Sequence, residues 1–178
     1  MPGGDEATQF PDLWDWLVDV YGARSVLDVG CGDGQAVDHF VGKGCFTIGI
    51  DGVPQKHERI ICHDYTTGPY TAATFRDFFD LVWCCEFVEH VEERYVENFL
   101  PSLRLGDLLL MTHAFPGQGG YHHVNCRTPD YWVGALAAVG YRLDPDLTAV
   151  TRALAARNPS LWNHYVRSGL AFRRYGVE

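Results

Sequence analysis

Val26-Leu-Asp-Val-Gly-Cys-Gly-Asp-Gly-Gln35 is the stretch that decides the fold, because an apolar strand ends there in a glycine-rich turn that enters a helix. The three glycines of the turn carry no Cβ, so a ligand can approach the backbone closely. A dinucleotide-binding fingerprint would need G-x-G-x-x-G, but the sixth position counted from Gly30 is Gln35. Asp28 and Asp33 also place carboxylates where they would repel a pyrophosphate. The turn is therefore expected to hold a ligand with an ammonium or sulfonium group and no phosphate.

Short apolar runs alternate with helical segments along the rest of the chain. Strands are expected near 25–29, 46–50, 59–62, 79–84, 107–113 and 170–175, and helices near 33–41, 91–99, 129–138, 147–156 and 159–166. Because the strand segments are almost continuously apolar, they should be buried on both faces. This pattern predicts an α/β fold with a doubly wound, mostly parallel sheet covered by helices on both faces.

The 178 residues are expected to form a single domain, 1–178, because no repeat and no long Pro/Gly/Ser tract divides them. Residues 1–24 are expected to supply an N-terminal cap helix, since apolar residues from Phe10 to Tyr21 recur at spacings of three and four. No apolar run approaches the roughly 20 residues that cross a bilayer, and the first residues do not resemble a signal peptide. A soluble, cytoplasmic protein without a membrane partner is expected.

Charge and cysteine content narrow the classes of partner. Acidic residues outnumber basic residues 23 to 14, and the formal net charge is −9. Proteins that bind extended nucleic acids depend on basic patches, whereas the longest basic run here is Arg173-Arg174, so a nucleic acid is not the expected partner. The six cysteines contain no C-x-x-C pair and are expected to stay reduced and structural.

Polar residues follow the first four predicted strands where each strand ends. They are Asp28, Asp51, the pair His63-Asp64, and Glu86. Open α/β sheets bind ligands in the crevice at the carboxyl ends of their strands, so these side chains are expected to outline a binding crevice. An acidic residue in the place of Asp51 can accept hydrogen bonds from ribose hydroxyls.

Together these motifs resemble the class I S-adenosylmethionine-dependent methyltransferases. The resemblance rests on Val26–Gly34, Gly49-Ile-Asp51, His63-Asp64, Phe79-Asp-Leu-Val82 and Glu86-Phe-Val-Glu-His90-Val91, in this order. It implies a Rossmann-like methyltransferase fold with a seven-stranded sheet whose last strand is antiparallel. It also implies S-adenosylmethionine as the cofactor.

Carried over residue by residue, the resemblance implies a set of cofactor-binding residues. They are Asp28, Gly30, Cys31, Gly32, Gly34, Asp51, Gly52, Asp64, Tyr65, Cys84, Cys85 and Glu86. Within this set the glycines would lie under the methionine end of the cofactor, Asp51 would hold the ribose, and Asp64 with Tyr65 would face the adenine. The backbone at Cys84–Glu86 would lie near the methionine amino group. The chain from Asp51 to Arg59 is too short for the full helix that is usual in the family, so a more open adenine pocket is expected.

Residues 114–127 form a His- and Gly-rich loop that follows the fifth strand and is the candidate active-site loop. A hydroxyl acceptor benefits from a positioned general base, and histidine is the usual base near neutral pH. His122 or His123 is therefore a candidate base, and His113 could orient the substrate. Neighbouring side chains in an extended loop point in opposite directions, so only one of the pair is expected to reach the pocket. These histidines could instead cap the helix at Thr128 or bind loop backbone.

No metal site is expected, because His113, His122, His123 and Glu86 match no short ligand motif such as H-E-x-x-H. His90 is expected to have a structural role or to line the pocket. Glu89, with Glu92 and Glu93, is expected to be a solvated charge in the first turn of a helix.

The predicted function is transfer of a methyl group from S-adenosylmethionine to a small-molecule or glycan acceptor, at oxygen. A non-catalytic methyltransferase-like binding or activator subunit is the alternative from another class. A nicotinamide-dependent oxidoreductase is disfavoured by the glycine spacing. Methylation of nucleic-acid amines is disfavoured because Cys84-Cys85-Glu86-Phe87 stands in place of an Asp-Pro-Pro-Tyr or Asn-Pro-Pro-Tyr tetrapeptide. The sequence names no protein partner.

Overall fold

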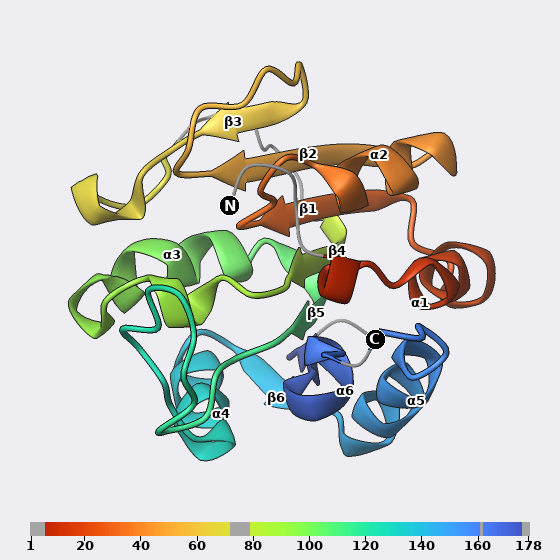
Figure 1. Ribbon diagram of the computed structural model, residues 1–178. Coiled ribbons are helices and arrows are strands. Elements are labelled where there is room, and N and C mark those ends of the chain that lie inside the picture. The colour runs from red at the N-terminus through yellow and green to blue at the C-terminus, as the bar shows by residue number, and fades with distance from the viewer. Residues whose placement is uncertain (1–5, 72–78, 161, 176–178) are drawn as a thin grey trace.

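The computed structural model describes residues 6–71, 79–160 and 162–175 (Figure 1). The strands within these ranges are β1 (Ser25–Val29), β2 (Phe46–Asp51), β3 (Ile60–Cys62), β4 (Phe79–Cys84), β5 (Gly106–Met111), β6 (Tyr141–Leu143) and β7 (Leu170–Arg174). The α-helices are α1 (Pro11–Trp16), α2 (Gln35–Gly42), α3 (Val96–Leu103), α4 (Pro129–Ala138), α5 (Pro145–Ala155) and α6 (His164–Ser168). Shorter turns are η1 (Glu6–Thr8), η2 (Leu17–Tyr21), η3 (Tyr65–Thr67), η4 (Val88–His90) and η5 (Glu93–Tyr95).

The strands form one seven-stranded sheet in the order β3-β2-β1-β4-β5-β7-β6. The five strands from β3 to β5 pair in parallel, whereas β7 is antiparallel to both of its neighbours. The predicted mostly parallel sheet with an antiparallel last strand is therefore confirmed. Leu170, the first residue of β7, lies opposite Met111, the last residue of β5. The chain that precedes β7 thus arrives at the same edge of the sheet where the parallel strands end.

Helices cover both faces of the sheet, as the apolar strands predict (Figure 1). On one face α1, α2, α5 and α6 pack on strand residues that include Val26, Trp83 and Leu110. On the other face α3 and α4 pack on residues that include Leu27 and Leu109. Successive strand residues therefore belong to opposite cores, which makes this a doubly wound α/β fold.

Most predicted elements lie within a few residues of their observed bounds, and three differ. The helix predicted near 91–99 begins only at Val96, because η4 and η5 occupy the preceding residues. The helix predicted near 159–166 is the short α6, with residue 161 outside the described residues. Strand β6 was not predicted, since three residues directly after Gly140 give too short a pattern.

Two further expectations concern the N-terminal residues and the connection between β2 and β3. Within residues 1–24, for which a cap helix is predicted, the structure has α1 followed by the π-helical turn η2, and the first five residues lie outside the described residues. No helix occurs between β2 and β3, as the short connection predicts. Among the described helices, none has the length and apolar character needed to cross a membrane.

Candidate functional site

A cavity of about 910 Å³ opens at the carboxyl edge of the sheet, where β1 and β4 end. Its walls come from the glycine turn, the end of β4, η4, the loop at 115–123, and the segment around α6. Seven residues of the predicted site line it: Asp28, Gly30, Cys31, Gly32, Cys85, Glu86 and His123. Lining residues that the sequence did not single out for chemistry include Gln118, Trp162, His164 and Arg167. The cavity therefore joins the predicted cofactor loop to the candidate active-site loop.

The glycine turn at one end of the cavity is fixed by its backbone. Gly30 has φ +79°, and a Cβ at this position would lie 2.5 Å from the side chain of Phe87. Only glycine fits there, because both the conformation and the space exclude a side chain. The N–H of Gly32 donates to Asp51 Oδ2 over 2.9 Å, and Asp51 Oδ1 accepts from the N–H of Val53 over 2.8 Å. Asp51 thus ties the turn to the end of β2.

Asp28 is a buried carboxyl group in the wall of this cavity, with 3% of its surface exposed. Burial, and secondarily the negative charge of Asp51, raises the pKa of Asp28 from 3.8 to about 8. No hydrogen bond from a described residue stabilises its charged form. A cationic ligand in the cavity would supply the missing stabilisation, which agrees with the ligand expected from the sequence.

The remaining predicted cofactor residues do not line the cavity. They are Gly34, Asp51, Gly52, Asp64, Tyr65 and Cys84. Tyr65 is buried in the core between the sheet and helices α3 and α4, and its hydroxyl donates to Ser102 Oγ over 2.8 Å. The side chain of Asp64 caps η3 by accepting from the N–H of Thr66. The cavity therefore covers the predicted methionine end of the cofactor site but not its predicted adenine end.

A polar triad of Glu86, Thr112 and His164 lies beyond β4, and Glu86 and His164 of this triad line the cavity. Glu86 Oε2 lies 3.0 Å from His164 Nδ1, and Thr112 Oγ1 donates to Glu86 Oε1 over 3.0 Å. Thr112 Oγ1 also accepts from the Glu86 N–H over 2.7 Å, and Glu86 has φ +52°. Burial alone would raise the pKa of Glu86, but its contacts with His164 and Thr112 outweigh burial and hold it below the usual range. Glu86 is therefore a carboxylate that orients the His164 ring.

Sequence reasoning did not assign a catalytic role to His164, and no local signal could have done so. His164 is the first residue of α6, which Asn163 caps by accepting from the N–H of Val166. Seventy-eight positions separate it from Glu86 (164 − 86), and the antiparallel β7 brings the two together. Their proximity is a property of the sheet topology and not of any motif.

The three predicted loop histidines occupy three different environments. His123 lines the cavity, whereas His122 is exposed with φ +53°. His113 is buried with its ring 4.8 Å from that of Phe115, and it does not line the cavity. Of the three, only His123 is placed to meet a ligand in this cavity.

The expectation that Glu89 is a solvated charge is wrong, because its surface is completely buried. Residues 88–90 form the turn η4 in place of the first turn of a helix, and the loop at 121–126 covers that turn. Burial, followed by the charge of Glu86, raises the pKa of Glu89 to about 8. His90 was expected to have a structural role or to line the pocket, and it lines the cavity. Burial lowers the pKa of His90.

Comparisons with known proteins agree with the observed fold. Residues 27–105 match a family model described as a methyltransferase domain. No curated protein sequence matches the chain. The magnesium protoporphyrin IX methyltransferase of Synechocystis PCC 6803, solved with bound SAH, is 14% identical with a TM-score of 0.60. The match covers 94% of this chain and 83% of that one.

Two further solved structures differ in what they act on. The 1,6-didemethyltoxoflavin-N1-methyltransferase of Burkholderia thailandensis, solved with S-adenosylhomocysteine, is 14% identical with a TM-score of 0.62, over 97% of this chain and 79% of that one. The small RNA methyltransferase HEN1 is 15% identical with a TM-score of 0.57, over 88% of this chain and 24% of that one. At these identities the likeness establishes the fold but leaves the acceptor open.

Proposed function

We propose that the chain is a class I S-adenosylmethionine-dependent methyltransferase, as its match to a methyltransferase-domain model over residues 27–105 supports, and that it methylates a hydroxyl oxygen of a small polar or sugar-type acceptor. The cavity of about 910 Å³ is the observation that carries the proposal. One end of it is the glycine turn, and the other end is lined by histidine, glutamine and arginine side chains. A donor at the first end and an acceptor at the second would meet inside one cavity.

The donor half of the cavity suits the methionine end of S-adenosylmethionine. Its sulfonium and ammonium groups are cationic, and Asp28 offers them a buried carboxyl group without a partner among the described residues. The glycine turn allows close approach of the ligand to backbone N–H groups. Asp51 already accepts two backbone hydrogen bonds, and a carboxylate has acceptor sites left for ribose hydroxyls.

The acceptor half offers a general base in His164. With Nδ1 directed at Glu86, the proton acceptor of the ring is Nε2. In the proposed step Nε2 takes the hydroxyl proton while the oxygen bonds to the methyl carbon. The bond from that carbon to sulfur breaks with its electron pair on sulfur, which leaves S-adenosylhomocysteine and a methyl ether. Proximity and in-line orientation inside the cavity supply the rest of the acceleration.

Charge favours a small acceptor over RNA. The net charge of −9 would repel an extended phosphate backbone, and a nucleic-acid binder usually draws its affinity from a basic patch. Acids also gather at the cavity itself, where Asp28, Asp33 and Glu86 are lining residues. The polar residues of the 115–123 loop and Arg167 suit the hydroxyl groups of a sugar-type molecule.

Replacing Asp51 with alanine is expected to weaken S-adenosylmethionine binding about tenfold to a hundredfold. The change removes the proposed ribose contacts and releases the N–H of Gly32, so the glycine turn loses its anchor. Calorimetric titration with S-adenosylmethionine and S-adenosylhomocysteine measures the effect, and Asp38→Ala, at an exposed ion pair with His57, is the matched control. Unchanged affinity in Asp51→Ala would mean that the ribose is bound elsewhere.

The acceptor class is tested with a labelled methyl donor. The full chain is incubated with labelled S-adenosylmethionine and, separately, with neutral sugars, nucleotide sugars, small phenols, primary amines and short RNAs. Label in an alkali-stable methyl ether of a sugar or phenol supports the proposal. Label found only on nitrogen or on RNA contradicts it, and cofactor binding without transfer to any class favours the non-catalytic subunit.

A further inference from the structure

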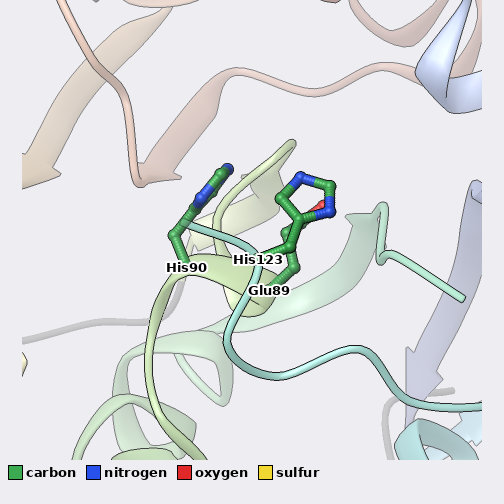
Figure 2. Close-up of side chains that lie close together, drawn as sticks. All are labelled: Glu89, His90 and His123. Carbon is green, nitrogen blue, oxygen red and sulfur yellow. The ribbon is translucent and has the colours of Figure 1, made fainter. Parts of the chain in front are cut away.

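We propose that Glu89, His90 and His123 form a binding site for one divalent transition-metal ion in the wall of the cavity. Each of the three offers one ligand atom, and these atoms all lie within 4.8 Å of one another. Figure 2 shows Glu89 and His90 projecting from one turn of the chain and His123 reaching them from the facing loop. Metal ligands around one ion lie roughly 3 Å apart, so a small movement of the two rings would complete the site.

Backbone hydrogen bonds bring these residues together across 33 positions of sequence (123 − 90). The carbonyl of Glu89 accepts from the N–H groups of Val124 over 2.9 Å and of Asn125 over 3.1 Å. The side chain of Asn125 donates to the carbonyl of Val88 over 3.3 Å. The loop is therefore fixed directly on η4, and His123 is held beside Glu89.

The strongest sign of a missing partner is the Glu89 side chain. It is completely buried beside the Glu86 side chain, and neither of its oxygens has a partner with good hydrogen-bond geometry among the described residues. His123 Nδ1 is also buried without a hydrogen-bond partner among those residues. A buried polar atom without a partner destabilises the fold, and more so when it is charged. A bound cation would satisfy the carboxylate and the ring nitrogen at once.

The ligand types select the kind of ion. Two imidazoles and one carboxylate suit Zn²⁺, Fe²⁺, Co²⁺ or Mn²⁺, whereas Ca²⁺ and Mg²⁺ prefer oxygen ligands alone. His90 Nδ1 lies 3.3 Å from the carbonyl of His122. Such a second contact fixes the tautomer of a ligating histidine and leaves Nε2 for the metal. Three protein ligands leave at least one coordination position for an outside group.

That open position would face the acceptor, because His90 and His123 both line the cavity. The metal would then bind an oxygen of the acceptor and orient it toward the donor. This role rests on the proposed methyl transfer, whereas metal binding itself does not. The site differs from the set that the sequence suggested and disfavoured, since His113, His122 and Glu86 are not ligands in it.

Cobalt titration of the full chain tests the site. The purified protein is stripped with a chelator and titrated with Co²⁺, and binding is followed by calorimetry and by the visible absorption of the ion. We expect one equivalent to bind, with a spectrum of nitrogen and oxygen ligands and without a thiolate charge-transfer band. Glu89→Gln and His123→Asn should each weaken binding at least tenfold. His57→Asn, at an exposed ion pair with Asp38, should leave it unchanged.

Cofactor titration of the same variants separates this proposal from the proposed function. S-adenosylhomocysteine should bind every variant with its original affinity, which also shows that the variants are folded. The metal site is overturned if Co²⁺ does not saturate at one equivalent, if both ligand variants bind it as before, or if a thiolate band appears. Loss of cofactor binding by the original chain with Co²⁺ binding intact would contradict the proposed function and leave the metal site standing.

Discussion

His164→Asn is expected to lower turnover about 10² to 10⁴-fold at saturating S-adenosylmethionine, which is the usual contribution of a general base. Asparagine keeps a polar group beside Glu86, from which His164 Nδ1 is 3.0 Å away, but it cannot take a proton from the acceptor. The measurement is single-turnover transfer of a labelled methyl group to the acceptor found in the screen. Affinity for S-adenosylhomocysteine should stay the same, because the change lies in the acceptor half of the cavity.

The partner variant Glu86→Gln distinguishes a base from a merely structural histidine. It removes the charge that orients the ring while the contact with Thr112 can persist. If the two residues act as a unit, the double variant should be no slower than His164→Asn alone, because effects within a unit are not additive. Turnover of His164→Asn within threefold of the original chain would leave proximity or His123 to account for the reaction.

Asp28→Asn is expected to stabilise the cofactor-free protein, and to do so more at pH 8 than at pH 5. Burial raises the pKa of Asp28 to about 8, so the folded state keeps a proton that the unfolded state loses above about pH 4. Asp28 therefore lowers the free energy of unfolding of the original chain progressively as the pH rises from about 4 to 8. Asp51 from β2 is the charge that acts on Asp28, whereas the neighbouring thiols of Cys31 and Cys84 stay uncharged because burial raises their pKa.

Asparagine does not titrate, so the variant escapes this loss. The free energy of unfolding of Asp28→Asn, relative to that of the original chain, should rise by about 2–4 kcal/mol between pH 5 and pH 8, since each pH unit is worth about 1.4 kcal/mol. Urea unfolding at both pH values measures it, with Asp38→Asn as an exposed control. The same variant should bind S-adenosylmethionine more weakly, because the cation loses its buried counter-charge. An equal gain in stability at both pH values would contradict the raised pKa.

The core of the fold could be predicted from the sequence because its signals are local. Strands such as β1 and β4 are continuous apolar runs, and the glycine turn marks the junction with α2. Strand β6 carries only three residues, and its place in the sheet depends on pairing with β7. Its pattern is too short to be separated from a loop.

The wall of the cavity at the glycine turn was more predictable than the wall at His164, because its signals too are local. The residues of the glycine turn are neighbours in sequence, so their common place in the cavity wall follows from spacing. The burial of Glu89 could not be predicted from the local sequence. Acidic residues before a helix are usually solvated, but the loop that carries Asn125 covers Glu89. The contact of His164 with Glu86 likewise depends on tertiary structure that no periodicity encodes.

The reversed direction of β7 also determines how the protein can be attached to a surface. Arg173 pairs with Leu108 near the start of β5, so the chain leaves the sheet after Arg174 at the end remote from the cavity mouth. Thr8, by contrast, is itself a lining residue. A tether or fusion joined after β7 should therefore leave the opening toward solution, whereas one joined before η1 would crowd it. Biosensor measurements of ligand binding are best made with the chain immobilised through its C-terminal side.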